Sequence, residues 1–311
     1  MGPPRDSSEA SRLGKATKRP ASGIAPTGDM KRIGRVRSSM IYQYDGSFDG
    51  LLCCVFESVA RKEVPEGVYG PGHFQMSMFE TRTIETDPIH ARRVLASIPK
   101  KMGREALDFV RKAFLTCLPE KERHIVLFLR MGYEYGSKVM RMLADDVVNT
   151  LFKAVKHLEG EAHLLTGFIR FSIHDKALVA QITPKNYVLP ILAPHFRGRY
   201  PDENFLIYDK THGDVLVYEH KKTQVFSVER FALPDPDEEE RRFRALWRMF
   251  YETIAVPGRE NPRCRMAQMP KRYWENMTEF AVEKDVLVRQ AAPPANASSA
   301  GKRGLPKGSV F

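Results

Sequence analysis

A change in the spacing of apolar residues near residue 167 constrains the fold of this chain more than any other feature. Residues 145–165 carry an apolar side chain at every third or fourth position, which is the period of an amphipathic helix. After Gly167 this period stops, and short segments with strand-like alternation follow. The predicted strands cover residues 168–173, 177–183, 204–209, 214–219 and 224–228.

Helical patterns lie on both sides of these strands. The first half of the chain shows a short strand at Met40, a helix capped by Ser47, and further helical stretches at 103–117 and 120–134. We expect residues 62–80, which are rich in Gly and Pro, to form a loop. After the strands, the acidic run at residues 235–240 begins a long helix. We expect the apolar residues of that helix to face the core; they are Phe243, Leu246, Trp247, Phe250 and Ile254.

This order of elements predicts an α+β fold. We expect a helical N-terminal half packed on a mostly antiparallel sheet of about five strands, followed by C-terminal helices. A helix at about 188–198 interrupts the series of strands. The order does not match a regular βαβ series.

The net charge of +11 is concentrated at the two ends of the chain. Residues 1–37 carry nine Lys and Arg against three Asp and Glu, a net charge of +6, and residues 290–311 carry +3. Only +2 remains for residues 38–289. Both ends are also rich in Pro, Gly, Ser and Ala, so we predict disordered basic tails around a single α+β domain at 38–289. The tails could attract phosphate or serve only to keep the protein in solution.

The sequence predicts neither a metal site nor a membrane segment. The four cysteines, Cys53, Cys54, Cys117 and Cys264, have no zinc-site spacing, and no cofactor can be identified for this chain. No apolar run reaches the roughly 18 residues that a transmembrane helix needs. We therefore predict a cytoplasmic protein with reduced thiols, no metal and no membrane contact.

Four motifs together resemble a known family. They are YDGSFDG at residues 44–50, EAHLLTGFIRF at 161–171, LAPHFRGRYPDENFLIYD at 192–209 and MPKRYWENMTEF at 269–280. They resemble a bacterial domain-of-unknown-function family that is associated with DNA metabolism and DNA repair, over residues 40–282. The resemblance implies a partner, a radical-SAM protein of DNA modification or repair. Some members are fused to a uracil-DNA glycosylase-like domain. The resemblance supplies no catalytic residues.

Three residues are candidate catalytic groups. His163 lies on the polar face of the helix at 145–165, Arg170 lies on the following strand, and His195 lies on the helix at 188–198. If these elements fold back on each other, a histidine could act as acid or base beside an arginine that binds phosphate or carboxylate. The alternative for His163 and Arg170 is a capped helix end tied to its neighbouring strand by hydrogen bonds.

Two basic segments are candidate nucleic-acid contacts. Arg197 and Arg199 could grip a phosphodiester, although an ion pair between Arg199 and Asp202 would explain the pattern equally well. In the second segment no acidic residue occurs between Glu260 and Glu275. Cations beside aromatic rings are typical of single-stranded or flipped-base binding. The alternative is that Trp274 anchors the C-terminal segment to the core. The candidates in this second segment are Arg263, Arg265, Lys271, Arg272, Tyr273 and Trp274.

Three functions follow as hypotheses from the sequence. The first is an accessory protein that binds DNA or a damaged nucleotide together with a radical-SAM partner. The second is a nucleic-acid-processing enzyme with a His/Arg pocket. The third is a protein-interaction adaptor without direct DNA contact. The sequence leaves open whether the protein is an enzyme.

Overall fold

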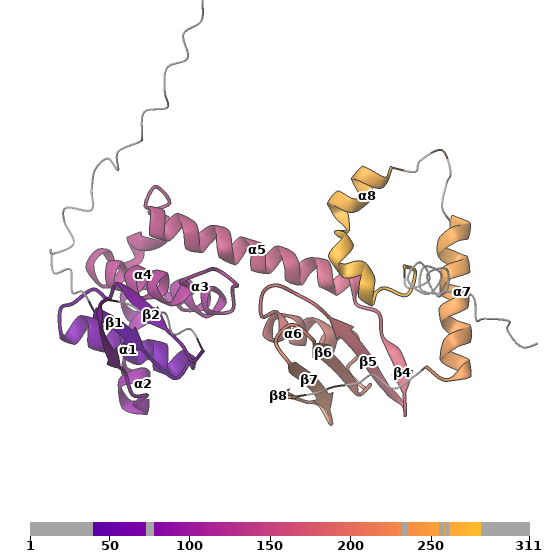
Figure 1. The fold of residues 1–311 in the computed structure, drawn as a ribbon, viewed down its shortest axis with the longest axis horizontal. Coiled ribbons are helices and arrows are strands. Elements are labelled where there is room, and N and C mark those ends of the chain that lie inside the picture. The colour runs from indigo at the N-terminus through magenta and orange to yellow at the C-terminus, as the bar shows by residue number, and fades with distance from the viewer. Residues whose placement is uncertain are drawn as a thin grey trace, which may run out of the picture.

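The computed structural model describes residues 40–72, 78–229, 231, 236–254, 258 and 261–280. The tails predicted at 1–37 and 290–311 lie outside these residues. Figure 1 shows a helical first part and a sheet-containing second part, joined by the long helix α5 (Asp146–Phe168). The first part contains β1 (Met40–Gln43), α1 (Phe48–Ala60), β2 (Gly67–Tyr69), β3 (Glu80–Thr83), α2 (Pro88–Met102), α3 (Arg104–Phe114), α4 (Lys121–Tyr135) and η1 (Gly136–Arg141). The second part contains β4 (Ser172–His174), β5 (Ala177–Ile182), α6 (Leu189–Arg199), β6 (Phe205–Asp209), β7 (Asp214–Glu219), β8 (Lys222–Ser227), α7 (Glu238–Ile254), α8 (Pro262–Gln268) and η3 (Lys271–Asn276).

The first part is built on a small parallel sheet that the sequence did not predict. Its strand order is β2-β1-β3, and β1 pairs in parallel with both neighbours, with Ile41 opposite Gly67 and Thr81. The prediction that residues 62–80 form a loop was therefore wrong for β2. A strand of three residues carries too little alternation to be recognised, and its pairing depends on a partner distant in sequence.

The second sheet has five strands in the order β4-β5-β6-β7-β8. The pairs β4/β5, β6/β7 and β7/β8 are antiparallel, whereas β5 and β6 are parallel. Parallel neighbours require a crossover connection, and α6 lies within it. The predicted α+β fold with a mostly antiparallel sheet of five strands is confirmed.

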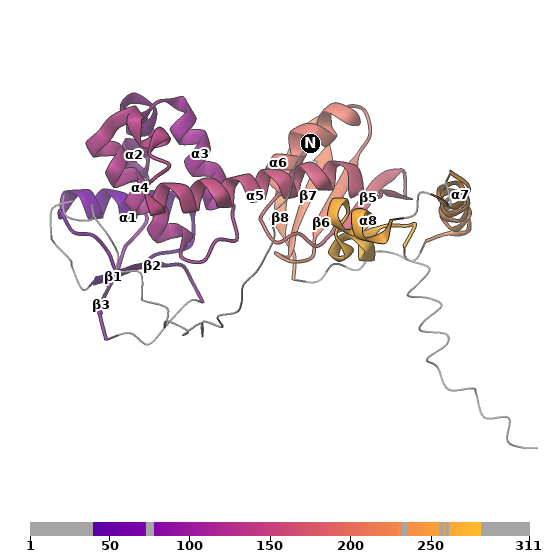
Figure 2. The ribbon, with the colours of Figure 1, turned by 90° about the horizontal axis from the view of Figure 1, so that it is seen from above.

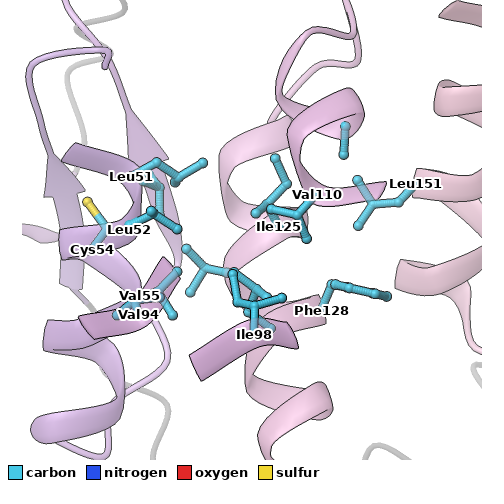
Figure 3. Packing of buried hydrophobic residues seen from close by; sticks show 14 of the residues in the cluster. Leu51, Leu52, Cys54, Val55, Val94, Ile98, Val110, Ile125, Phe128 and Leu151 are labelled. Carbon is cyan, nitrogen blue, oxygen red and sulfur yellow. The ribbon is translucent and has the colours of Figure 1, made fainter. Parts of the chain in front are cut away.

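Buried apolar side chains form two clusters, one in each part. The first cluster includes Ile125 and Phe128 and reaches Leu151 on α5, as Figure 3 shows. The first cluster ends at Val155 and the second begins at Leu158, three residues further along the same helix. The second cluster includes residues of the five-stranded sheet and α6. A helix of 23 residues is about 35 Å long, so α5 connects both clusters without a break (Figures 1 and 2). The prediction of a single domain at 38–289 stays a prediction.

Helix α7 is attached to the rest of the protein by polar contacts. Glu240 is buried, accepts a hydrogen bond from the backbone N of Ile173 at 3.3 Å, and pairs with Arg244 at 2.7 Å. Arg244 also donates to Ser172 Oγ at 2.6 Å. The prediction that the apolar face of this helix packs on the core was wrong, because these polar contacts determine which side faces the sheet. The apolar residues Phe243, Leu246, Met249, Phe250 and Ile254 are each 47–59% exposed.

The attachment of α7 is expected to weaken in acid. Burial alone would raise the pKa of Glu240, but hydrogen bonds from Arg244, Ser172 and Ile173 outweigh it and hold the pKa below its ordinary value of 4.5. A lowered folded-state pKa gives stability that is present above the unfolded pKa and is lost as pH falls through the folded pKa. Tryptophan fluorescence of a Trp274→Phe variant, in which Trp247 is the remaining tryptophan, should report α7 leaving the sheet below about pH 4.5. The same titration with Glu240→Gln should lack this transition, and an unchanged profile would contradict the assignment.

Candidate nucleic-acid interface and its polar support

Glu161 of α5 is a buried carboxylate that accepts four hydrogen bonds and forms one ion pair. It is 3% exposed and accepts from the backbone N atoms of Lys185 and Asn186 at 3.0 and 2.8 Å and from Asn186 Nδ2 at 2.7 Å. It also accepts from the Tyr273 hydroxyl at 3.2 Å and pairs with Arg272 at 3.0 Å. A buried charge is tolerated when it is paired and fully hydrogen-bonded. Glu161 therefore fixes η3 and the loop after β5 to α5.

Two of the predicted nucleic-acid contacts belong to this support. Tyr273 lies in the second core, where burial raises the pKa of its hydroxyl, and Arg272 donates to that hydroxyl and lies 4.7 Å from the centre of its ring. The Arg272 side chain is partly exposed beside them. Tyr273 thus positions Arg272 and has no free ring face at the surface.

Trp274 is also anchored, as the alternative interpretation expected. Its ring stacks on Phe280 with centroids 4.4 Å apart, and its Nε1 donates to the carbonyl of Met269 at 3.0 Å. Arg265 and Lys271 lie 5.4 and 5.5 Å from the ring centre. Such cation–π contacts hold charged side chains over a ring while their charge stays in water.

Three exposed cations lie in the segment that carries this anchored ring, and we call them the cation group: Arg263 and Arg265 on α8, and Lys271 on η3. All three are exposed, and within the described part of the chain none of them forms an ion pair with a carboxylate. Their positive charges are therefore not neutralised locally. The structure brings them together on α8 and η3.

The residues predicted on α6 do not join the cation group. His195, Arg197 and Arg199 are exposed, and in both Figure 1 and Figure 2 α6 lies on the other side of α5 from α8. Arg199 donates to the Tyr200 hydroxyl at 3.3 Å. The alternative prediction of an ion pair between Arg199 and Asp202 was wrong. Asp202 pairs with Lys221 instead, with 3.7 Å between Oδ1 and Nζ.

The three predicted catalytic residues are not joined to one another by any hydrogen bond or ion pair that the described residues form. His163 is exposed on α5, and His195 contacts Phe196 edge-on at 4.9 Å. Arg170 lies between α5 and β4 instead of on a strand, and it pairs with Glu279 at 2.7 Å. Its role there is to hold the C-terminal segment against the end of α5.

A different histidine has the environment expected of a proton-transfer group. His212, in the turn between β6 and β7, places Nδ1 2.6 Å from Oδ2 of the fully buried Asp209. The ring of Tyr187 packs edge-on against His212 at 5.3 Å, and its hydroxyl donates to Asp214 at 2.7 Å. A carboxylate that orients one ring nitrogen leaves the other for acid–base chemistry. In the sequence this pair was interpreted only as part of a turn. A histidine three residues after an aspartate that ends a strand could have indicated the pair.

The described residues hold no metal centre and no candidate membrane span. No group of three or more His, Cys, Asp or Glu side chains is arranged around a common point in that part of the chain. No described helix is long and apolar enough to cross a bilayer.

Fold and site together define an α+β protein with a buried carboxylate that supports a cationic surface. The chain belongs to the family described as a domain of unknown function, DUF4130, which it matches over residues 119–279. The match runs from the start of α4 to Glu279 and leaves the motif at residues 44–50 outside it. The predicted membership of a domain-of-unknown-function family is confirmed. No curated protein matches the chain.

Proposed function

We propose that this protein is a nucleic-acid-binding accessory protein of DNA repair or DNA metabolism that acts with a radical-SAM partner. The observation that carries the proposal is the cation group, because exposed cations that form no ion pair with a described carboxylate attract phosphate. The resemblance of its motifs to a DNA-metabolism family supports DNA as the ligand and the radical-SAM protein as the partner. The overall charge of +11 adds long-range attraction.

The support beneath the cation group favours phosphate contact over base stacking. Glu161 holds Arg272 and Tyr273 in place, and Phe280 covers one face of Trp274. The group is therefore held on an ordered frame, while its anchored aromatic rings have little free surface for a base. Phosphate contacts position a ligand without reading its sequence. The expected binding is salt-dependent and insensitive to sequence.

Removal of the three charges should weaken DNA binding and flatten its salt dependence. In the variant Arg263→Gln/Arg265→Gln/Lys271→Gln, three phosphate contacts are lost, so affinity for single-stranded DNA should fall about tenfold or more at low salt. The slope of log K against log salt should become less steep by about 2, which is three contacts at roughly 0.7 each. Fluorescence anisotropy of a labelled oligonucleotide over a series of salt concentrations measures both quantities.

The matched control removes three exposed cations from the other part of the protein: Arg92→Gln/Lys100→Gln/Arg104→Gln. It changes the net charge equally and leaves both tails intact, so its affinity should stay within a factor of about two of the wild type. Equal losses in both variants would mean that only overall charge matters. Absence of binding by the wild-type protein, with stable co-purification of the radical-SAM partner, would support the adaptor function instead.

The pair Asp209–His212 favours a second candidate function, that of a nucleic-acid-processing enzyme. His212 has an oriented ring, whereas His163 and His195 have no polar side-chain partner among the described residues. Lesion-bearing DNA would be incubated with the protein, with and without its radical-SAM partner, and the product mass recorded. We expect His212→Gln to abolish any product while DNA affinity is retained, and His163→Ala and His195→Ala to retain the product. Full activity of His212→Gln would contradict the proposal that His212 is the catalytic group of such an enzyme.

A further inference from the structure

A hollow of about 740 Å³ opens at the carboxyl ends of the parallel strands β1 and β2. Tyr44 follows β1, Tyr69 ends β2, and the opposite wall comes from Phe114 and the connection from α3 to α4. Ligands of open parallel sheets bind outside the carboxyl ends of the strands, and small-molecule sites have volumes of roughly 300–1,000 Å³. The hollow therefore has the position and the size of a ligand site. It is separate from the cation group.

The walls of this hollow are suited to a flat ring. Tyr69 contributes a half-buried ring to the lining. The ring of Tyr44 is only 4% exposed, and the ring of Phe114 packs on Phe48 and lies under the amine of Lys121. Gly46 and Gly70 bring the two strand-end loops together: a Cβ on Gly70 would lie 3.4 Å from the Cα of Gly46. Gly46 also has a positive φ of 82°, which favours glycine. A partly exposed ring such as that of Tyr69 stacks on planar ligands, and nucleobases are the planar ligands of a DNA-binding protein.

The polar groups of the hollow are suited to the edge of a neutral ring. Lys121 uses one of its donors on the carbonyl of Phe114 at 2.7 Å, and burial lowers the pKa of its amine. Burial, together with the nearby carboxylate of Glu122, raises the pKa of the Tyr44 hydroxyl. Glu120 adds a second acid, so the lining carries one cation against two carboxylates. A phosphate would be repelled by this charge, whereas a base offers both donors and acceptors.

We propose that this hollow binds a nucleobase, stacked on Tyr69 and hydrogen-bonded along its edge by Lys121 and Glu122. The inference rests on the proposed function both for the choice of a base as the planar ligand and for DNA as its source. A chain of hydrogen bonds and one ion pair runs from the hollow to Arg272, the residue that follows Lys271 of the cation group. The backbone N of Cys117, in the lining, donates to Asn186, which donates to Glu161, which pairs with Arg272. In this proposal, a DNA strand held by its phosphates at the cation group supplies the base by extruding it.

Two exposed thiols allow the two sites to be tested separately. Cys117 lies in the hollow and Cys264 lies on α8 beside the cation group, and both are free and exposed, whereas Cys53 and Cys54 are buried. The whole protein would be alkylated with iodoacetamide in the presence of adenosine, guanosine, cytidine or uridine at millimolar concentration. Mass spectrometry of the digested peptides gives the alkylation rate of each thiol. We expect at least one nucleoside to slow alkylation of Cys117 about threefold or more and to leave Cys264 unchanged.

Two variants test which residues form hydrogen bonds to the base. Lys121→Met and Glu122→Gln should each lower the affinity for the protecting nucleoside about fivefold or more, because each removes a hydrogen bond to the bound base. Lys138→Met removes an exposed lysine on η1 as the matched control, and protection should be unchanged. Circular dichroism checks that each variant is folded, and calorimetry measures the nucleoside affinity directly.

The outcomes distinguish this inference from the proposed function. An oligonucleotide that protects Cys264, with no nucleoside protecting Cys117 and no heat of nucleoside binding, would overturn the base site and leave DNA binding intact. Protection of Cys117 by a nucleoside, without any DNA affinity, would support the base site and overturn the proposed function. Protection that survives both Lys121→Met and Glu122→Gln would overturn the assignment of these residues.

Discussion

Replacing Glu161 by alanine is expected to destabilise the protein by about 3–5 kcal/mol. The substitution leaves the buried amide groups of Lys185 and Asn186 without an acceptor and removes the partner of Arg272. It also removes the contact that holds η3 against α5. The free energy of unfolding, measured by urea denaturation monitored by circular dichroism, should fall by that amount.

A neighbouring glutamate on the same helix provides the matched control. Glu159 pairs with Lys112 at 2.6 Å, but both side chains are more than 40% exposed. An exposed ion pair contributes about 0–1 kcal/mol, so Glu159→Ala should have a small effect. Glu161→Gln keeps the shape but loses the charge, and its cost should lie between the two. Equal costs for Glu161→Ala and Glu159→Ala would show that the buried carboxylate is not the support described above.

Replacing Phe128 by alanine should have an effect of similar size in the first core. Phe128 of α4 is completely buried, and its ring centroid lies 5.1 Å from that of Phe109 (Figure 3). Truncation of a buried phenylalanine leaves a cavity and costs about 3–5 kcal/mol. Thermal or urea unfolding measures the loss. Ile89→Ala serves as control because Ile89 is 73% exposed, and its effect should be within about 0.5 kcal/mol.

The two variants together test the prediction of a single domain. Glu161 lies in the second part of the protein and Phe128 in the first. The two parts share α5, and Asn186 bonds both to Glu161 and to the backbone of Cys117. We therefore expect one unfolding transition that shifts in both variants. Two transitions, each shifted by only one of the substitutions, would contradict the single domain at 38–289.

Local periodicity explains which elements could be predicted from the sequence. The helix predicted at 145–165 is α5, and the strands predicted at 204–209 and 214–219 match β6 and β7, because each pattern is complete within its own segment. The strand β2 and the parallel pairing around β1 depend on residues far apart in the chain. The orientation of α7 was missed because two polar contacts to β4, from Ile173 N to Glu240 and from Arg244 to Ser172, select the side that faces the sheet.

The candidate site was predicted only in part, because only its local patterns could be recognised in the sequence. The local concentration of cations at 263–272 was visible in the sequence, and so was the anchoring role of Trp274 as an alternative. The partners of Glu161 were not visible, since Asn186 lies 25 residues away and Tyr273 lies 112 residues away. His212 was overlooked because its partner, Asp209, lies within what the pattern indicated to be an ordinary hairpin turn.

The division of α5 between two cores affects the order in which the chain can fold during synthesis. All members of the first cluster lie between residues 40 and 155, so it can assemble before the five-stranded sheet has been translated. At that stage the second half of α5 displays Leu158, Ala162 and Leu165 without their partners. Residues 169–280 must then emerge from the ribosome before that surface is covered. The nascent protein therefore passes through an interval in which half of one helix is an exposed hydrophobic surface, a condition that favours aggregation and chaperone binding.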